Sequence, residues 1–386
     1  MEFYPDANRI ESVARIRHAA REFAEHELRP AVMTRDESQE FPFAIVRKLG
    51  ELHFMGALAP RTFEGAGLSV LEFTAIIEEL SRVDPSVGLT VSAHNALGVG
   101  HILAFGSDEQ KRRYLPDLCT GRAMGAWCLT EPEAGSDSSG MQTQAERDGD
   151  CWVLNGTKAF ITHGSVASTY TVMAVTGREN GKNRVSAFIV ERGMEGLRPG
   201  APLNKLGMRS SDTAMLTFEN VRVPSANLIG SEGEGLRQAL SLLDTGRIGI
   251  AALGVGLAQG ALDASVAYVK KRKQFGRALA EFQAIQWKIA ELHTEIEAAR
   301  LLTQKAALMK FRGERFSSEA SQAKYFAAAA AERAANEAVQ MLGGNGFIKD
   351  YPVEKLYRDA KLLSIGEGTT EVQKMIIAKH VIGSYA

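Results

Sequence analysis

The amino-acid sequence predicts an α+β protein of several domains, in which a helical region, an antiparallel β region and a second helical region follow one another. The chain of 386 residues is long enough for two or three domains. Prolines are scattered from Pro5 to Pro224 and absent between Pro224 and Pro352, which favours long helices in that span. The middle of the chain has strand-like runs without a βαβ alternation, which argues against a doubly wound nucleotide-binding fold.

The first region, up to about Leu118, carries apolar residues at helical spacing. Prolines at positions 30, 42 and 60 separate the predicted helices. The segments with this spacing are Ile10–Leu28, Ala44–Leu52 and Val70–Leu80.

The middle region predicts antiparallel strands. Asn155-Gly156 lies between the strand-like runs Cys151–Leu154 and Thr157–Thr162. This dipeptide is the strongest short hairpin signal, because a type I′ turn needs positive φ at both central residues. Further runs rich in β-branched and aromatic residues are Tyr170–Val175, Val185–Val190 and Ala214–Val223.

The last region predicts a bundle of long helices joined by short loops. Ser317 or Ser318 is the expected N-cap of the third helix. Gly254-Val255-Gly256 lies inside a helical stretch with no strand before it, so it indicates close helix packing and not a dinucleotide fingerprint. The expected helices are Leu236–Lys271, Trp287–Lys310 and Ala323–Leu342.

Composition excludes several classes of function. A formal net charge of -1 gives no strong field for nucleic acid or for an anionic membrane. No apolar stretch is expected to span a bilayer. The three cysteines and eight histidines match no metal-ligand spacing, so no metal site is expected. Met1–Asp6 lacks the start of an export signal, and the odd number of cysteines then indicates a reducing compartment.

Two stretches at the β region suit a flat polar ligand. Trp127–Asp137 is rich in small and hydroxyl residues, whose backbone N–H groups and hydroxyls could bind a heterocycle or a phosphate; a locally capped turn is the alternative. Phe160 and Thr162 alternate to one face of a strand and could line a planar ring. Taken alone, the pair is better explained by a core phenylalanine with an edge threonine.

Two more stretches lie at predicted helix ends. Arg272–Arg277, with Lys271, carries four positive charges, which suit either a pyrophosphate or the helix dipole. Gln340–Gly346 contains paired glycines, which mark a helix C-cap and also permit close approach of a ligand to the backbone.

Glu367 is a carboxylate between two glycines, Gly366 and Gly368, after the helical region. A carboxylate that reaches into an apolar cavity has a raised pKa and becomes a usable base near neutral pH. The alternative is a solvated glutamate in a glycine-rich turn.

Taken together and in this order, these motifs resemble the acyl-CoA dehydrogenase family from about Ile10 to Ile382. The shared motifs are CLTEPEAGSD, NGTKxFIT, KLGMRSSDT, RKQFG, LGGNG and EGTT. The run from Leu243 to Gln259 is most similar to short-chain and short branched-chain members.

The resemblance implies an architecture and a cofactor. It implies an N-terminal α-helical domain (1–122), a middle β-barrel domain (123–230) and a C-terminal four-helix bundle (231–386). It also implies bound FAD and a homotetramer built as a dimer of dimers.

The resemblance assigns cofactor contacts in three groups. The flavin ring would be lined by Trp127, Cys128, Leu129, Thr130, Gly135, Ser136, Phe160, Ile161 and Thr162. A neighbouring subunit would contribute Arg272, Gln274, Phe275, Phe282, Gln283, Gln340, Met341, Gly343 and Gly344. The FAD phosphate and adenosine would lie near Gly368, Thr369 and Glu371.

The resemblance also implies the reaction. Glu367 would remove the α proton of the thioester and flavin N5 would take the β hydride, giving a trans-2-enoyl-CoA. Ser136, Asp244, Arg247 and Gly368 would also contact the acyl-CoA. Electrons would pass to electron-transferring flavoprotein, in fatty acid β-oxidation or branched-chain amino acid catabolism. The protein would be cytoplasmic, or in the mitochondrial matrix if it is a processed eukaryotic form.

Several positions depart from the family pattern. Trp127 replaces a common Tyr and Phe160 a common Trp, and both remain aromatic. Gly366 stands where many members carry Tyr, which widens the region near the carboxylate. Gly246 occupies the position at which some members place the base. No Arg lies in Val91–Ile102, which disfavours a dicarboxylyl-CoA.

The predicted substrate is therefore a short, or short branched, saturated acyl-CoA. Two alternatives stay open: a flavin-dependent acyl-CoA oxidase or monooxygenase of the same fold, and a helical binding protein without catalysis.

Overall fold

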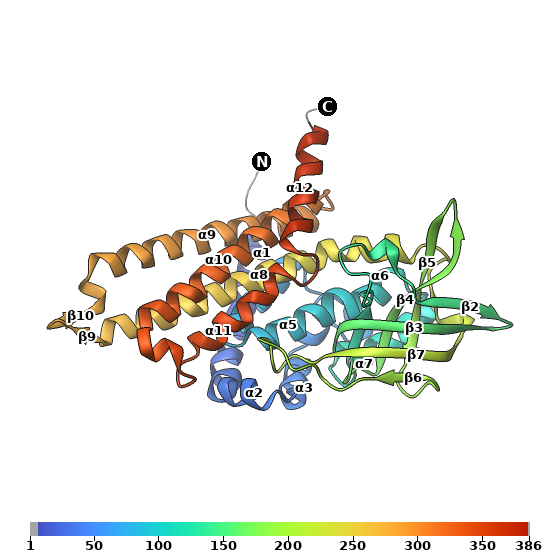
Figure 1. Ribbon diagram of the computed structural model, residues 1–386, viewed down its shortest axis with the longest axis horizontal. Helices are drawn as coiled ribbons and strands as arrows, with labels where there is room; N and C mark the ends of the chain where they lie inside the picture. The colour runs from blue at the N-terminus through green and yellow to red at the C-terminus, as the bar shows by residue number, and fades with distance from the viewer. Residues whose placement is uncertain (1–6, 385–386) are drawn as a thin grey trace.

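The computed structural model describes residues 7–384, and the expectation about an export signal at Met1–Asp6 lies outside them. Figure 1 shows an elongated molecule with the β-sheet at one end and a long helical arm at the other. The predicted order of helices, strands and helices is confirmed.

The N-terminal region is helical throughout, with short π and 3-10 segments between the α-helices. Ser69 caps α4, and Glu72 completes its capping box. The elements are α1 (Ala7–Phe23), η1 (Ala24–Leu28), η2 (Arg29–Ala31), α2 (Val32–Ser38), α3 (Phe43–Glu51), η3 (Phe54–Gly56), η4 (Arg61–Phe63), α4 (Val70–Val83), α5 (Pro85–Ala93), η5 (His94–Val99), α6 (Gly100–Phe105) and α7 (Asp108–Cys119).

The middle region is an eight-stranded sheet in the order β6-β7-β3-β2-β4-β5-β8, with β1 also paired to β4. Most pairs are antiparallel as predicted, but β4 pairs in parallel with β1 and β2. The elements are β1 (Gly125–Cys128), η6 (Ser138–Gly140), β2 (Gln144–Asp148), β3 (Cys151–Thr162), β4 (Thr169–Glu179), β5 (Lys182–Glu191), β6 (Leu197–Pro199), β7 (Thr213–Pro224), η7 (Ser225–Asn227) and β8 (Leu228–Ile229).

The prediction of a hairpin at Asn155-Gly156 is wrong, because β3 runs straight through this dipeptide. The chain turns instead between β2 and β3, after Asp148. Gly156 is a β-bulge with φ +149°, and a Cβ there would lie 2.5 Å from Oγ1 of Thr143. The Asn155 side chain binds Asn220 on β7. Pairing on both edges of β3 therefore overrides the local turn preference.

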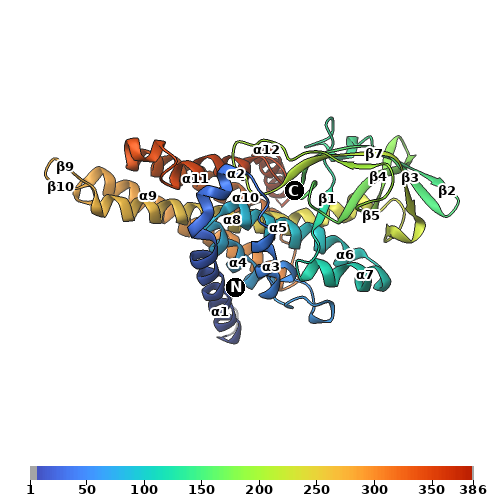
Figure 2. The same ribbon diagram turned by 90° about the horizontal axis from the view of Figure 1, so that it is seen from below.

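The C-terminal region contains the three predicted long helices. Figure 2 shows α8 running lengthwise through the helical part of the molecule, with α4 and α10 beside it. The elements are α8 (Gly235–Lys271), β9 (Lys273–Gln274), β10 (Arg277–Ala278), η8 (Leu279–Glu281), α9 (Gln283–Phe311), α10 (Ser317–Leu342), η9 (Gly343–Phe347), α11 (Val353–Ala360), η10 (Lys361–Ser364) and α12 (Thr370–Ser384).

Two predictions about these helices are corrected. Phe316 is the N-cap of α10, without a side-chain cap, because the Ser317 hydroxyl donates to Asp244 instead. α8 is long and apolar enough to cross a membrane by length and composition, contrary to expectation, and an 18-residue stretch of it has a mean hydropathy of 1.5. However, 67% of that stretch is buried inside the protein, as in the core helix of a soluble protein.

The predicted close packing at Gly254 and Gly256 is confirmed. A Cβ at Gly256 would lie 2.2 Å from the carbonyl oxygen of Glu78, and one at Gly254 would lie 3.0 Å from that of Ala327. α8 therefore touches α4 on one side and α10 on the other, which joins the N-terminal and C-terminal regions.

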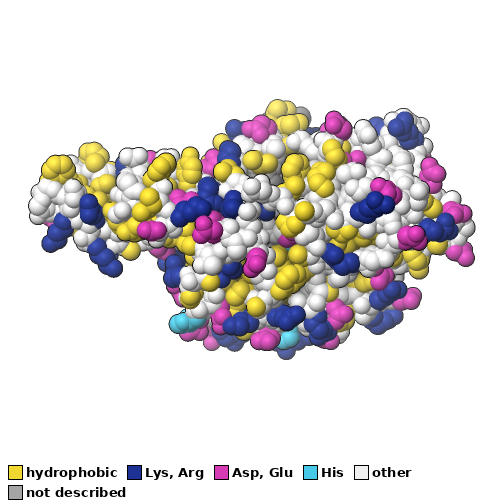
Figure 3. All heavy atoms as spheres, turned by 60° about the horizontal axis from the view of Figure 1, so that its bottom comes forward, with side chains coloured by type: hydrophobic (Ala, Val, Ile, Leu, Met, Phe, Trp, Pro, Cys, Tyr) yellow, Lys and Arg dark blue, Asp and Glu magenta, His cyan; other side chains and the backbone are white. Residues whose placement is uncertain are grey.

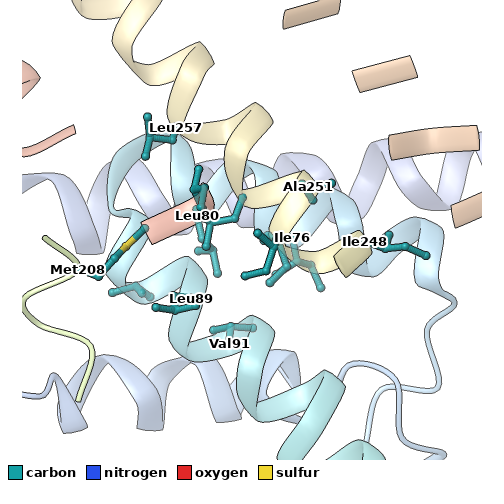
Figure 4. Close-up of a cluster of buried hydrophobic side chains, with 14 of the residues drawn as sticks. Ile76, Leu80, Leu89, Val91, Met208, Ile248, Ala251 and Leu257 are labelled. Carbon is teal, nitrogen blue, oxygen red and sulfur yellow. The ribbon is translucent and has the colours of Figure 1, made fainter. Parts of the chain in front are cut away.

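One hydrophobic core joins these regions. Figure 4 shows buried side chains from α4, α5, α8 and the loop before β7 packed together. The labelled members are Ile76, Leu80, Leu89, Val91, Met208, Ile248, Ala251 and Leu257.

A buried charge cluster fastens α11 to the N-terminal region. Lys355 lies 2.5 Å from Asp359 and 3.2 Å from Asp84, and all three side chains are almost fully buried. Arg35 also contacts Asp84, at 3.1 Å. Burial alone would lower the pKa of Lys355, but Asp359 and then Asp84 outweigh it and hold the pKa above its usual value.

Candidate functional site

Glu367 lies in the turn between η10 and α12, against α8. Its φ is +53° and that of Gly368 is +90°, so the turn uses the left-handed region twice. A Cβ at Gly246 would lie 2.0 Å from Oε2 of Glu367. The glycine in the middle of α8 therefore makes room for the carboxylate.

The Glu367 side chain is partly buried, and one of its carboxylate oxygens is enclosed against α8. Its Oε2 is buried and has no hydrogen-bond partner among the described residues. Burial raises the pKa of Glu367 to about 7, against the lowering effects of Lys324 and then Arg247. The group can therefore gain and lose a proton near neutral pH.

Asp244 and Arg247 were predicted as a substrate-binding pair, and the structure brings them together on α8. Nη1 of Arg247 lies 2.6 Å from Oδ1 of Asp244, which also accepts a hydrogen bond from Ser317 at 3.0 Å. Burial raises the pKa of Asp244 and lowers that of Arg247. Nε of Arg247 is buried without a partner among the described residues, so one donor remains available to a ligand.

Lys324 is a buried lysine that the sequence interpretation missed. It projects from the alanine-rich α10, is 0% exposed, and donates from Nζ to the carbonyl oxygen of Gly368 at 2.7 Å. The sequence signal that could have identified it is a single lysine within an otherwise alanine-rich helical segment.

The two stretches at the β region lie side by side. The backbone N–H of Ala159 donates to the carbonyl oxygen of Thr130 at 2.8 Å. Beneath them, buried Lys158 donates to Glu131 at 2.7 Å and to the carbonyl oxygen of Leu129 at 3.1 Å. These bonds tie the loop after β1 to β3.

The side chains of these stretches divide into buried and exposed sets. Phe160 has φ +54° at a break in the strand register, and its ring is 68% exposed. Cys128, Leu129 and Ile161 face the core and can offer only backbone groups to a ligand. A planar ring placed against Phe160 would cover its exposed face, so this surface fits a flavin.

The loop after Thr130 contains both a local cap and an open surface. The backbone N–H of Ser139 donates to Asp137, as in the capped turn of the alternative interpretation. Gly135 and Ser136 are exposed, and a Cβ at Gly135 would meet nothing within 4 Å. The backbone there is open to a ligand.

Trp127 connects the β region to α8. Its indole Nε1 donates to Nδ1 of His101 at 2.9 Å, and Nε2 of His101 lies 3.0 Å from Oε1 of Gln238. Burial lowers the pKa of His101 to about 4, so the ring is neutral at pH 7, with its proton on Nε2. Trp127 also packs against a small cluster made of Ala96, Leu97 and Leu242, of which Leu242 lies on α8.

Leu242 and Gly246 are four residues apart, so they lie on one side of α8 about 6 Å apart along its axis. The cluster that Trp127 packs against includes Leu242, and Glu367 lies at Gly246. The structure thus places Glu367 and the cluster beside Trp127 at neighbouring points on α8.

The cofactor residues that were predicted to reach a neighbouring subunit lie far from the β-sheet within this chain. Figure 1 places the β9–β10 hairpin at the far end of the arm from the sheet. Phe275 at its tip is 94% exposed, and Arg277 stacks on the ring of Phe282 at 4.0 Å. Figure 3 shows further apolar side chains on the surface of this arm. One chain alone cannot bring this hairpin to Phe160.

The predicted helix end at Gln340–Gly344 lies near this hairpin. α10 ends at Leu342, and Gly343 has φ +60°, so the predicted C-cap is confirmed. The side chain of Asn345 donates to the Tyr268 hydroxyl near the end of α8, at 2.8 Å. Gln340, Gly343 and Gly344 are exposed, whereas Met341 is buried.

We expect Gly246→Ala to lower turnover by about 10²-fold, because the new methyl group would displace the Glu367 carboxylate by about 1 Å. Steady-state kinetics with an acyl-CoA would measure this loss. Gly383→Ala is the matched control, since Gly383 also lies in a helix and its added Cβ would meet nothing within 4 Å. Equal turnover in the two variants would show that the carboxylate does not need this space.

Profiles of one family match three consecutive parts of the chain. They are described as the acyl-CoA dehydrogenase N-terminal domain (residues 11–122), middle domain (126–221) and C-terminal domain (233–382). The short-chain specific acyl-CoA dehydrogenase of Clostridium acetobutylicum is 46% identical over 363 residues, which cover 94% of this chain and 96% of that protein.

Solved structures match the chain over nearly its whole length. Butyryl-CoA dehydrogenase from Megasphaera elsdenii superposes with a TM-score of 0.94 at 39% identity, covering 99% of this chain and 100% of that one. A chain in a structure of the electron transferring flavoprotein of Acidaminococcus fermentans superposes with a TM-score of 0.95 at 43% identity, covering 99% of both. The protein therefore belongs to the acyl-CoA dehydrogenase family, whose members are FAD-dependent oxidoreductases that act on acyl-CoA thioesters.

Proposed function

We propose that this protein dehydrogenates a short, or short branched, saturated acyl-CoA to its trans-2-enoyl-CoA, and that Glu367 is the base. The observation that carries the proposal is the Glu367 carboxylate, which lies against Gly246 of α8 with Oε2 buried and has a pKa of about 7. The short-chain relative and the butyryl-CoA dehydrogenase structure support the acyl length.

In this mechanism the α C–H bond of the thioester breaks and its proton passes to the Glu367 carboxylate. Bound FAD supplies the acceptor for the β hydride, and the electron pair of the α C–H bond forms the new double bond. Backbone N–H donors stabilise the charge that develops on the thioester carbonyl oxygen. Asp244, Arg247, Ser136 and Gly368 contact the acyl-CoA, and the unpartnered Nε of Arg247 supports this assignment.

The proposed FAD site is shared between subunits of a homotetramer. One chain contributes the flavin-facing surface around Trp127, Thr130, Phe160 and Thr162. A second copy contributes the β9–β10 hairpin, together with the helix end at 340–344. The distance between these parts within one chain, and the 94% exposure of Phe275, support this division. Gly368, Thr369 and Glu371 contact the phosphate and adenosine part.

The proposed electron acceptor is electron-transferring flavoprotein, in fatty acid β-oxidation or branched-chain amino acid catabolism. A cytoplasmic or mitochondrial-matrix location remains a prediction. A Cβ at Gly366 would make ordinary van der Waals contact with Leu362, 3.5 Å from its Cδ1. Whether branched acyl groups are accepted is part of the substrate test below.

Anaerobic titration with butyryl-CoA tests the proposal. We expect a yellow protein whose flavin absorbance is bleached by the substrate and returns only slowly in air. Rapid reoxidation with formation of peroxide would identify an oxidase or monooxygenase instead. A colourless protein that does not take up FAD would identify a binding protein without catalysis. Dye reduction with straight and branched acyl-CoAs would then rank the substrates.

A further inference from the structure

We infer that Lys324 is a positioning residue for the proposed base: it fixes the turn that carries Glu367 and supplies the positive charge that balances its carboxylate. The inference rests on the proposed function, because it gives Lys324 a role through Glu367. Lys324 touches neither the predicted flavin surface nor the Asp244–Arg247 pair by any hydrogen bond among the described residues.

Lys324 holds the backbone of the turn that carries Glu367. Glu367 and Gly368 both have positive φ, and such a conformation at a glutamate persists only where surrounding contacts hold it. The carbonyl oxygen of Gly368 accepts two hydrogen bonds, from Nζ of Lys324 at 2.7 Å and from Nε2 of Gln373 at 2.9 Å. Both donors are fully buried. They fix the direction in which the Glu367 side chain leaves the turn.

Lys324 also supplies a buried positive charge near Glu367. Within residues 7–384, no carboxylate lies within 4.0 Å of Nζ of Lys324, although its side chain is 0% exposed. A buried ammonium group with no carboxylate in direct contact acts on the nearest anion through a poorly screened medium. Burial lowers the pKa of Lys324 to about 8, and Glu367 is the main group that opposes this lowering.

The charged groups around the pair come from each neighbouring helix. Arg247 on α8 also favours the ionised form of Glu367, while Asp244 is paired with Arg247. Glu371 on α12 is exposed, and its field reaches Lys324. Lys310 on α9 is directed to Thr245, at 2.7 Å. Lys324 is therefore the largest favourable charge for the Glu367 carboxylate.

Removing the Lys324 charge leaves burial less opposed, so the pKa of Glu367 rises further above its ordinary value. The base must be deprotonated to accept the α proton, so the variant needs a higher pH to reach full activity. A residue that only supported folding would lower activity at every pH alike.

The experiment compares kcat/KM for butyryl-CoA against pH in the FAD-loaded wild-type protein and in Lys324→Met, Lys324→Gln and Lys324→Arg. We expect the acidic limb to move up by about 1 pH unit or more in the Met and Gln variants. It should stay near the wild-type position in Lys324→Arg, which keeps the charge. Lys324→Gln keeps a hydrogen-bond donor, so it should retain a higher maximal kcat than Lys324→Met.

Lys361→Met is the matched control, because Lys361 lies six residues before Glu367 but is 54% exposed. It should leave the limb unchanged. Infrared difference titration of the carboxylate, with Glu367→Gln as reference, should give the same shift without turnover. If Lys324→Met does not fold, the limb of Lys324→Gln decides.

Unchanged limbs in both neutral variants would overturn the inference. That failure is distinct from failure of the proposed function, in which Glu367→Gln itself would remain active.

Discussion

Replacing Glu367 with glutamine is expected to lower turnover by about 10²–10⁴-fold while the protein keeps its FAD. Glutamine has nearly the same shape and fits the space that Gly246 provides, but its amide cannot accept the α proton. Stopped-flow measurement of flavin bleaching by butyryl-CoA under anaerobic conditions isolates this step from reoxidation. The visible flavin spectrum before mixing checks that the cofactor is bound.

The same variant should be as stable as the wild type, or more stable, above neutral pH. The pKa of Glu367 in the folded state, about 7, lies above its ordinary value of 4.5 because the group is buried. The folded protein therefore binds more protons than the unfolded chain between these values, and the wild type loses stability as pH rises through this window. Glutamine removes this loss. Melting temperatures at pH 5 and pH 8 should show a difference that grows with pH.

Glu332→Gln is a suitable control for both measurements, since Glu332 lies on α10 and pairs with exposed Lys361. Near-normal bleaching in Glu367→Gln would refute the assignment of the base. A melting difference that shrinks with pH would contradict the raised pKa.

The largest expected effect on stability comes from Lys355→Met. This change should cost about 3–5 kcal/mol, because it leaves the buried carboxylates of Asp84 and Asp359 without their shared counter-charge. Arg35 still compensates Asp84 in part, whereas Asp359 would keep the backbone N–H of Met208 but no contacting cation among residues 7–384. The unfolding midpoint in denaturant, followed by circular dichroism, measures the loss.

The second change Asp359→Asn should recover part of this loss. Asparagine removes the uncompensated charge and retains an oxygen that can accept from Met208. Lys361→Met, at an exposed pair with Glu332, should cost less than about 1 kcal/mol. An equal midpoint for Lys355→Met and Lys361→Met would mean that the buried cluster does not hold α11 to the N-terminal region.

Local sequence patterns predicted most elements but failed where a long-range contact competes. The three long helices follow from the absence of proline and from apolar spacing, and the structure has them at nearly the predicted residues. Asn155-Gly156 failed because strands pair on both sides of β3 and the glycine is needed for contact with Thr143. Ser317 failed as a cap because Asp244, distant in sequence, takes its hydroxyl.

The order of the motifs and the position of Glu367 between two glycines were determined by the sequence alone, because turn residues and helix spacing act through near neighbours. The contact with Gly246, 121 positions earlier, and the charge of Lys324 were decided only by the tertiary structure. Burial and through-space charge depend on which distant helices meet. Burial raises the pKa of Glu367, and the charge of Lys324 opposes that rise. No local sequence pattern contains either effect.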